Sequence, residues 1–156
     1  MMLMALLKAV HVRAVLVWVG GMAFAHFFLR PSLALLEPAQ RVRLMHAVLG
    51  RFFAAVLVAA GLILVSGLWI IGRVAKLTVQ SGARFSWPLD WVVMTVVGVL
   101  MIAIFGHIRF VLYRRLDRAV QAGDTPAGGA ALAAIRQWVG VNLALGLALV
   151  AGVLIY

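Results

Sequence analysis

Four long apolar stretches divide the chain, and each is long enough to cross the hydrocarbon core of a bilayer, which takes about 20 helical residues. They span residues 4–29, 44–71, 89–113 and 135–156, and the first is expected to stop before Pro31. Polar residues and prolines gather between them, and no further stretch of that length remains. The pattern predicts an all-α integral membrane protein, a bundle of four transmembrane helices that forms a single membrane domain over residues 1–156.

Composition supports the bilayer as the solvent. Hydrophobic residues make up 66% of the chain and charged residues 12%, against about 45–50% and about 25% in soluble domains. The chain has no cysteine, which excludes disulfides, thiolate metal sites and iron–sulfur clusters. The net charge is +10, and the arginines that give rise to it flank the apolar spans. We therefore expect lipid headgroups and not nucleic acid as the anionic partner.

The basic residues are divided unequally between the two predicted membrane faces. Five lie on the side of the chain ends (Lys8, Arg13, Arg73, Lys76 and Arg84), and nine lie on the other side (Arg30, Arg41, Arg43, Arg51, Arg109, Arg114, Arg115, Arg118 and Arg136). Cytoplasmic loops carry the excess of lysine and arginine. We therefore expect the first and third loops in the cytoplasm and both termini on the periplasmic side.

Four histidines are the main chemical resource, because the four carboxylates lie at or beyond helix ends. Paired-carboxylate hydrolysis and a hard-cation site with oxygen ligands are therefore not expected. Helical spacing places Lys8, His11, Trp18, Met22 and His26 in a stripe about 80° wide along the first helix. Ionisable groups in membranes seldom face lipid, so this stripe should face the bundle interior.

Three of the histidines, His26, His46 and His107, come from different helices but lie at a similar depth near the predicted inner face, and His11 lies toward the outer face. Imidazoles from different helices suit a transition metal or a haem iron, and thioethers favour copper(I). Asn142 on the fourth helix is placed to orient an imidazole. The order of the helices decides whether the histidines converge, and interfacial bonding to water or plain packing stays open for each residue. The candidate metal ligands are His11, His26, His46, His107, Met22 and Met94.

The segment LKAVHVRAVLVWVGG resembles the first helix of the copper resistance protein D (CopD) family, in which Lys8, His11, Trp18, Gly20 and Gly21 fit the pattern. Residues 50–70 resemble the second helix of that family, and residues 106–150 resemble the end of its short single-domain members. The resemblance implies a multi-pass protein of the bacterial inner membrane that handles copper in transport or resistance, with copper contacts at histidine and methionine.

The same first-helix pattern is similar to that of the HemJ-type four-helix protoporphyrinogen oxidases. That likeness implies haem b at His11, and His107 matches a second histidine of that family. By depth, Arg51 and Arg109 suit the haem propionates. A lysine that HemJ proteins carry early in the third helix is absent, since Trp91 is followed by valines and a methionine.

Three functions therefore remain open: a copper-binding protein, a b-type haem redox protein, and an accessory subunit whose histidines are structural. No catalytic residue is predicted, and only the haem alternative implies an enzyme, a haem-dependent oxidoreductase. Four short spans form a narrow bundle, so transport would require a homodimer or a larger membrane complex.

Overall fold

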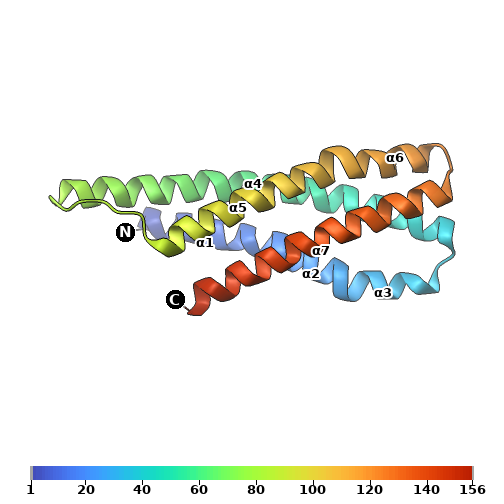
Figure 1. Ribbon diagram of the computed structural model, residues 1–156, viewed down its shortest axis with the longest axis horizontal. Helices are drawn as coiled ribbons and strands as arrows, with labels where there is room; N and C mark the ends of the chain where they lie inside the picture. The colour runs from blue at the N-terminus through green and yellow to red at the C-terminus, as the bar shows by residue number, and fades with distance from the viewer. Residues whose placement is uncertain (1, 156) are drawn as a thin grey trace.

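The computed structural model describes residues 2–155, with Leu154 as backbone only, and contains four long helices joined by short turns (Figure 1). All four are long and apolar enough to cross a membrane, which confirms the predicted all-α membrane fold. Met1, in the predicted domain, and Tyr156, in the predicted fourth span, lie outside the described residues.

The first helix is continuous from residue 2 to residue 35, but its winding changes along its length. It comprises α1 (Met2–Val15), the π-helical turn η1 (Leu16–Gly20), α2 (Gly21–Phe24), a second π-helical turn η2 (Ala25–Leu29), α3 (Arg30–Ser32) and the 3-10 turn η3 (Leu33–Leu35). We refer to the whole as helix one.

Helix one continues through Pro31, where the sequence predicted its end. A proline ring clashes with the carbonyl four residues earlier and removes one hydrogen bond. Here the wider π-helical turn η2 comes directly before the proline, and the Ser32 hydroxyl donates to the Phe28 carbonyl at 2.9 Å. The local rewinding and this side-chain bond explain why the chain stays helical.

The other helices are longer than their apolar parts. They are α4 (Pro38–Gln80), the run of α5 (Leu89–His107), η4 (Ile108–Leu112) and α6 (Tyr113–Gln121), and α7 (Thr125–Ile155). A capping box between Glu37 and Gln40 starts α4. The connection before α7 is short, residues 122–124, where Gly123 has φ +67° and Asp124 accepts the backbone N–H of Ala127 at 2.8 Å.

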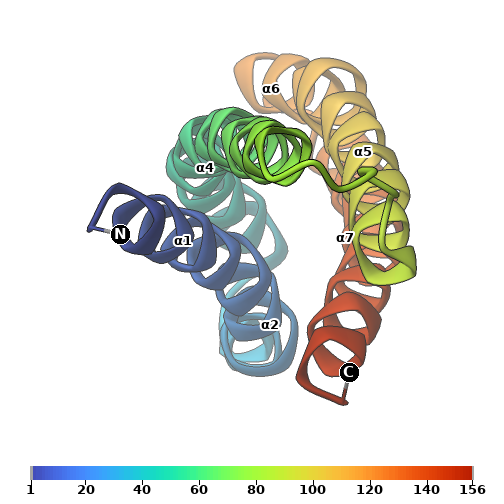
Figure 2. The ribbon, with the colours of Figure 1, turned by 90° about the vertical axis from the view of Figure 1, so that its left-hand side faces the viewer.

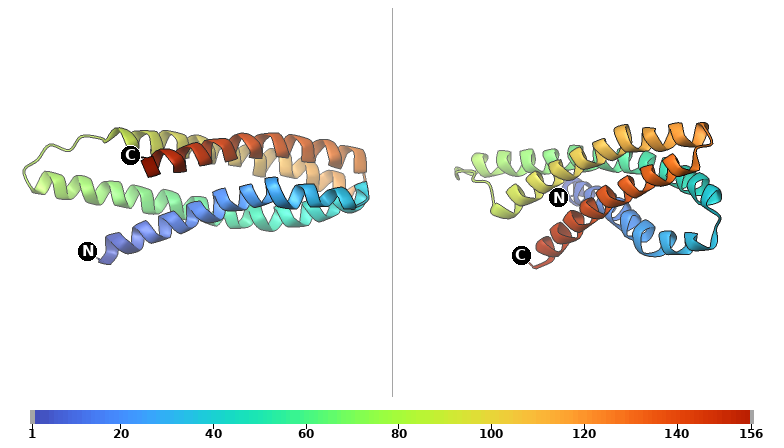
Figure 3. Two further views of the ribbon diagram at one scale, coloured as in Figure 1. Left: turned by 90° about the horizontal axis from the view of Figure 1, so that it is seen from below. Right: turned by 45° about the vertical axis from the view of Figure 1, so that its right-hand side comes forward.

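The helices form two pairs that run along the length of the molecule, helix one with α4 and α5–α6 with α7 (Figure 3). Helix one packs on α4, α5–α6 packs on α7, and α7 also contacts helix one and α4 (Figure 2). Aromatic rings join the pairs in the middle, because Phe105 contacts Trp18 and Phe53 with ring centroids 5.7 and 5.8 Å apart. The buried core runs along this line.

The two ends of the bundle differ in charge and in how far the helices continue beyond their apolar parts. One, the arginine-rich end, holds the turns at 36–37 and 122–124, and the other, the termini end, holds residues 81–88 and both ends of the described chain (Figure 1). On α4 the apolar run 52–72 between Arg51 and Arg73 measures about 32 Å at 1.5 Å per residue, close to the ~30 Å of a hydrocarbon core. We call residues 38–50, 113–121 and 125–135, which lie at the arginine-rich end, the helical extension.

Candidate functional site

The centre of the bundle holds two thioethers and one amide. Met22 and Met101 are 2% and 4% exposed, and Asn142 is 0% exposed. The Asn142 side chain donates from Nδ2 to the Met101 carbonyl at 3.3 Å, while its Oδ1 is buried without a hydrogen-bond partner among the described residues. A buried, unpaired amide oxygen costs free energy, so this position is a candidate for a missing ligand.

The packing of helix one on α7 sets the level of Met22. A Cβ built on Gly146 would lie 2.9 Å from Val19 Cγ2 and 3.1 Å from Met101 Cε, and one built on Gly140 would lie 3.8 Å from His26 Cε1. The two helices run in opposite directions, so Met22, between Val19 and His26, lies level with residues 142–144. Met22 and Met101 belong to the same core cluster, and Asn142 is buried at a similar level of the bundle; we call these three residues the core site.

His11 bonds to Ser66 of α4, with 2.9 Å between Nδ1 and Oγ. The Ser66 hydroxyl donates its single proton to the Leu62 carbonyl of its own helix, so Oγ accepts from His11. Nδ1 of His11 is therefore the protonated nitrogen, and Nε2 keeps its lone pair. This is how a protein orients an imidazole that binds a metal through its other nitrogen.

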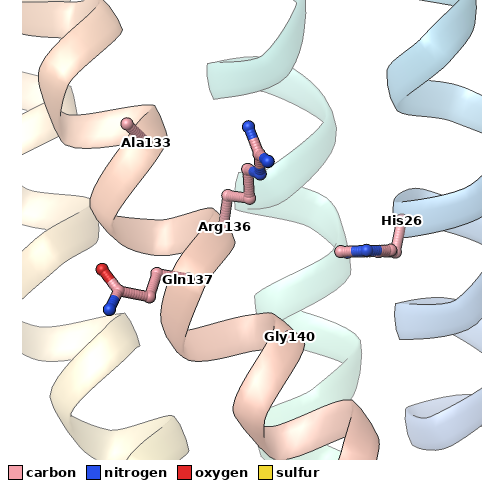
Figure 4. Close-up of a pocket in the computed structure, with 5 residues that line it drawn as sticks. All are labelled: His26, Ala133, Arg136, Gln137 and Gly140. Atoms are coloured by element: carbon pink, nitrogen blue, oxygen red, sulfur yellow. The ribbon is translucent and has the colours of Figure 1, made fainter.

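His26 lies in a groove between helix one and α7 at the arginine-rich end. Figure 4 shows its ring pointing from helix one toward Gly140, with Arg136 reaching from α7 into the same space. The groove encloses about 500 Å³ and continues over the start of α4. We call it the arginine groove; its charged and imidazole-bearing lining residues are His26, Arg30, Arg41 and Arg136.

His46 belongs to a separate network in the helical extension. Its Nε2 lies 2.8 Å from Asp117 Oδ1, its ring stacks on Tyr113 with centroids 5.3 Å apart, and the Tyr113 hydroxyl donates to the His46 carbonyl at 3.1 Å. Gln121 donates to the second carboxylate oxygen at 3.0 Å. These contacts tie α4 to α6, which is a structural arrangement.

The remaining predicted residues lie apart from these groups. His107 is exposed and its ring contacts Trp138 edge-on with centroids 5.3 Å apart. Arg51 is exposed on α4, and Met94 is half-buried in the first part of α5. The Arg109 guanidinium carbon lies 5.1 Å from the Tyr113 ring centroid, and its buried Nε has no hydrogen-bond partner in the described chain.

The structure thus separates the four histidines. Within residues 2–155, no group of three or more histidine, aspartate or glutamate side chains could hold one metal ion. His107 lies near the level of His26, because Trp138 is two residues from Gly140, whereas His11 is 15 residues from His26, or about 22 Å along the helix. A single haem iron could therefore bind only one of the two histidines, His11 or His107.

Two residues of the candidate sites, Ser66 and Met101, cannot be found from the spacing of the histidines. Ser66, 2% exposed, orients His11, and Met101 completes the core site. A serine beside a glycine in the middle of an apolar helix is the signal that points to Ser66, since small residues there mark close helix contacts. Met101 has no such mark, because its burial depends on where α7 packs.

Comparison with known proteins gives one match. A protein-family model described as Copper resistance protein D matches residues 46–155, which covers α4 from His46 onward and all of α5 to α7. No curated protein and no solved structure matches the chain. The match leaves helix one outside, so His11, Met22 and His26 rest on the sequence pattern and on the packing described above.

Proposed function

The chain belongs to the copper resistance protein D (CopD) family and is a copper-resistance-related membrane protein, and on that premise we propose that it binds Cu(I) between helix one and α7 in copper transport or resistance. The proposed ligands are Met22 and Met101 of the core site and His26 at the mouth of the arginine groove. No catalytic residue is proposed. The membrane is the bacterial inner membrane, with the arginine-rich end in the cytoplasm.

The burial of the core site carries this proposal. Two thioethers and an unpaired amide oxygen share the middle of an otherwise apolar bundle. Thioether sulfur selects Cu(I) over harder cations, and the Asn142 oxygen offers partial negative charge to a cation that has lost its water. Plain packing explains the methionines but gives no partner for that oxygen.

His26 and His11 extend the proposal toward the two ends of the bundle. His26 lies four residues after Met22, one helical turn closer to the arginine groove, so an ion released by Met22 meets an imidazole next. His11 lies 11 residues before Met22 on the same helix, nearer the termini end, where its Nε2 would offer a further ligand. Copper transfer would use these ligands in turn along helix one.

Competition for Cu(I) with a chromophoric chelator, on purified protein in mild detergent, tests the proposal. Met22→Leu and Met101→Leu keep the side-chain volume and remove the sulfur, and His26→Ala removes the imidazole. Each should weaken Cu(I) binding by about tenfold or more, or about 1.4 kcal/mol. X-ray absorption on the loaded protein should detect sulfur scatterers.

Met94→Leu is the matched control, because Met94 lies on α5 outside the core site. An unchanged affinity in that variant, with losses in the other three, supports the core site. Loss in Met94→Leu alone would move the copper ligands to the termini end. A Soret band in the purified protein that shifts on dithionite reduction would replace copper with haem b as the bound group.

A further inference from the structure

The arginine groove carries positive charge that the protein does not compensate. Within the described residues 2–155, the single ion pair is that of His46 with Asp117, and no carboxylate lines the groove. Arg41 is used internally, since its Nε and Nη2 donate to the Leu33 and Leu36 carbonyls at 3.1 Å each. Arg30 and Arg136 make no hydrogen bond or ion pair in that part of the chain.

These two guanidinium groups come from facing walls of the groove. Arg30 belongs to helix one and Arg136 to α7, and both line the arginine groove together with His26; Figure 4 shows His26 and Arg136 on facing helices. Their like charges are close enough to repel one another. Two unpaired guanidinium groups that face a common space fit an anion with several acceptor oxygens, and phosphate is an anion whose geometry the guanidinium fork matches.

Depth and lining decide which phosphate compound fits. Arg30 follows the apolar part of helix one, and Arg136 precedes the apolar part of α7, so both lie where lipid headgroups lie. Next to them the groove is lined by apolar side chains, including Ala25, Leu132 and Val139. A free phosphate ion would use only the charged part, whereas a phospholipid would use both parts.

We propose that the arginine groove binds an anionic phospholipid, with its phosphate between Arg30 and Arg136 and an acyl chain along the apolar wall between helix one and α7. The phosphate contacts of this site use neither Met22 nor Met101, although His26, a proposed copper ligand, lines the same groove. A basic pocket between transmembrane helices on the cytoplasmic side is a known type of site for anionic headgroups.

Native mass spectrometry of the purified protein tests the site, with dilauroyl phosphatidylglycerol and dilauroyl phosphatidylcholine as probes. The wild-type protein should bind phosphatidylglycerol at a lipid concentration about tenfold lower than the concentration of phosphatidylcholine needed for equal binding. The double variant Arg30→Gln/Arg136→Gln should lose that preference. The control Arg115→Gln/Arg118→Gln removes the same charge from exposed positions of α6 and should keep it.

Three outcomes would overturn the proposal. One is an equal loss in both double variants, which indicates general charge attraction. Another is displacement of the glycerol lipid by millimolar inorganic phosphate, which indicates a free-anion site. The third is haem retained in the groove.

Arg30→Lys/Arg136→Lys serves if the glutamine variant does not fold, and it should restore part of the preference for phosphatidylglycerol. Met22→Leu should leave lipid binding unchanged, so a failure of the copper proposal is distinguishable.

Discussion

His11 and Ser66 join helix one to α4 through a partly buried hydrogen bond. The distance of 2.9 Å and the orientation of the Ser66 hydroxyl toward Leu62 leave one consistent proton assignment. A Cβ on Gly67 beside Ser66 would lie 3.4 Å from His11 Cε1, an ordinary van der Waals distance. The contact therefore depends on the Ser66 hydroxyl and the imidazole.

Ser66→Ala should destabilise the bundle by about 1–3 kcal/mol, because it leaves the His11 N–H without an acceptor. Thermal unfolding in detergent, followed by circular dichroism, measures the effect as a lower Tm. Thr78→Ala is the control, since Thr78 donates to the Val74 carbonyl of its own helix as Ser66 does to Leu62, but within residues 2–155 its side chain makes no hydrogen bond to another helix. A Tm change as small as that of Thr78→Ala would show that the bond between the helices adds nothing.

At the scale of the elements, the apolar stretches predict the four helices, because a membrane helix must be apolar for about 20 residues. They do not predict the helix ends. The extra turns of α4 before residue 44 and of α7 before residue 135 pack on one another: a Cβ on Gly128 would lie 2.7 Å from Val42 Cγ1. Hydropathy alone does not predict such turns. Nor does it predict the π-helical turn η2 that lets helix one continue past Pro31.

Helix packing at Gly146 gives a second prediction. Gly146→Ala should lower the Tm and cost about 1–3 kcal/mol, because the new methyl meets Val19 and Met101 at 2.9 and 3.1 Å. Gly152 lies on the same helix with nothing within 4 Å of a Cβ, so Gly152→Ala should be neutral or slightly stabilising. Equal Tm values for the two variants would contradict the close approach of helix one to α7.

At the scale of the whole molecule, the sequence identifies the chemical groups but not their neighbours. His11, His26, His46 and His107 are visible in the sequence, and their depths follow from helix positions. Their separation does not, because the angular order of four helices decides which faces meet. The π-helical turns η1 and η2 add to this, since they rotate the face of helix one between His11 and His26 relative to a regular α-helix.

The orientation in the membrane can be tested with single cysteines, since the chain has none of its own. Ser81→Cys lies in the turn at the termini end, and Ala122→Cys lies in the turn at the arginine-rich end. A membrane-impermeant maleimide should label Ser81→Cys in intact spheroplasts and label Ala122→Cys only after permeabilisation, because the arginine excess belongs in the cytoplasm. The reverse pattern would place the arginine groove on the periplasmic side.

The spacing of Arg51 and Arg73 on α4 also has a consequence for where the protein resides. The apolar run between them, about 32 Å, leaves little spare length when the bilayer is thicker, and the charged groups at both ends resist being drawn into it. In a thinner bilayer the helix can tilt instead. The molecule should therefore tolerate thin membranes better than thick ones. Within one membrane it should gather in the regions whose hydrocarbon core is thinner.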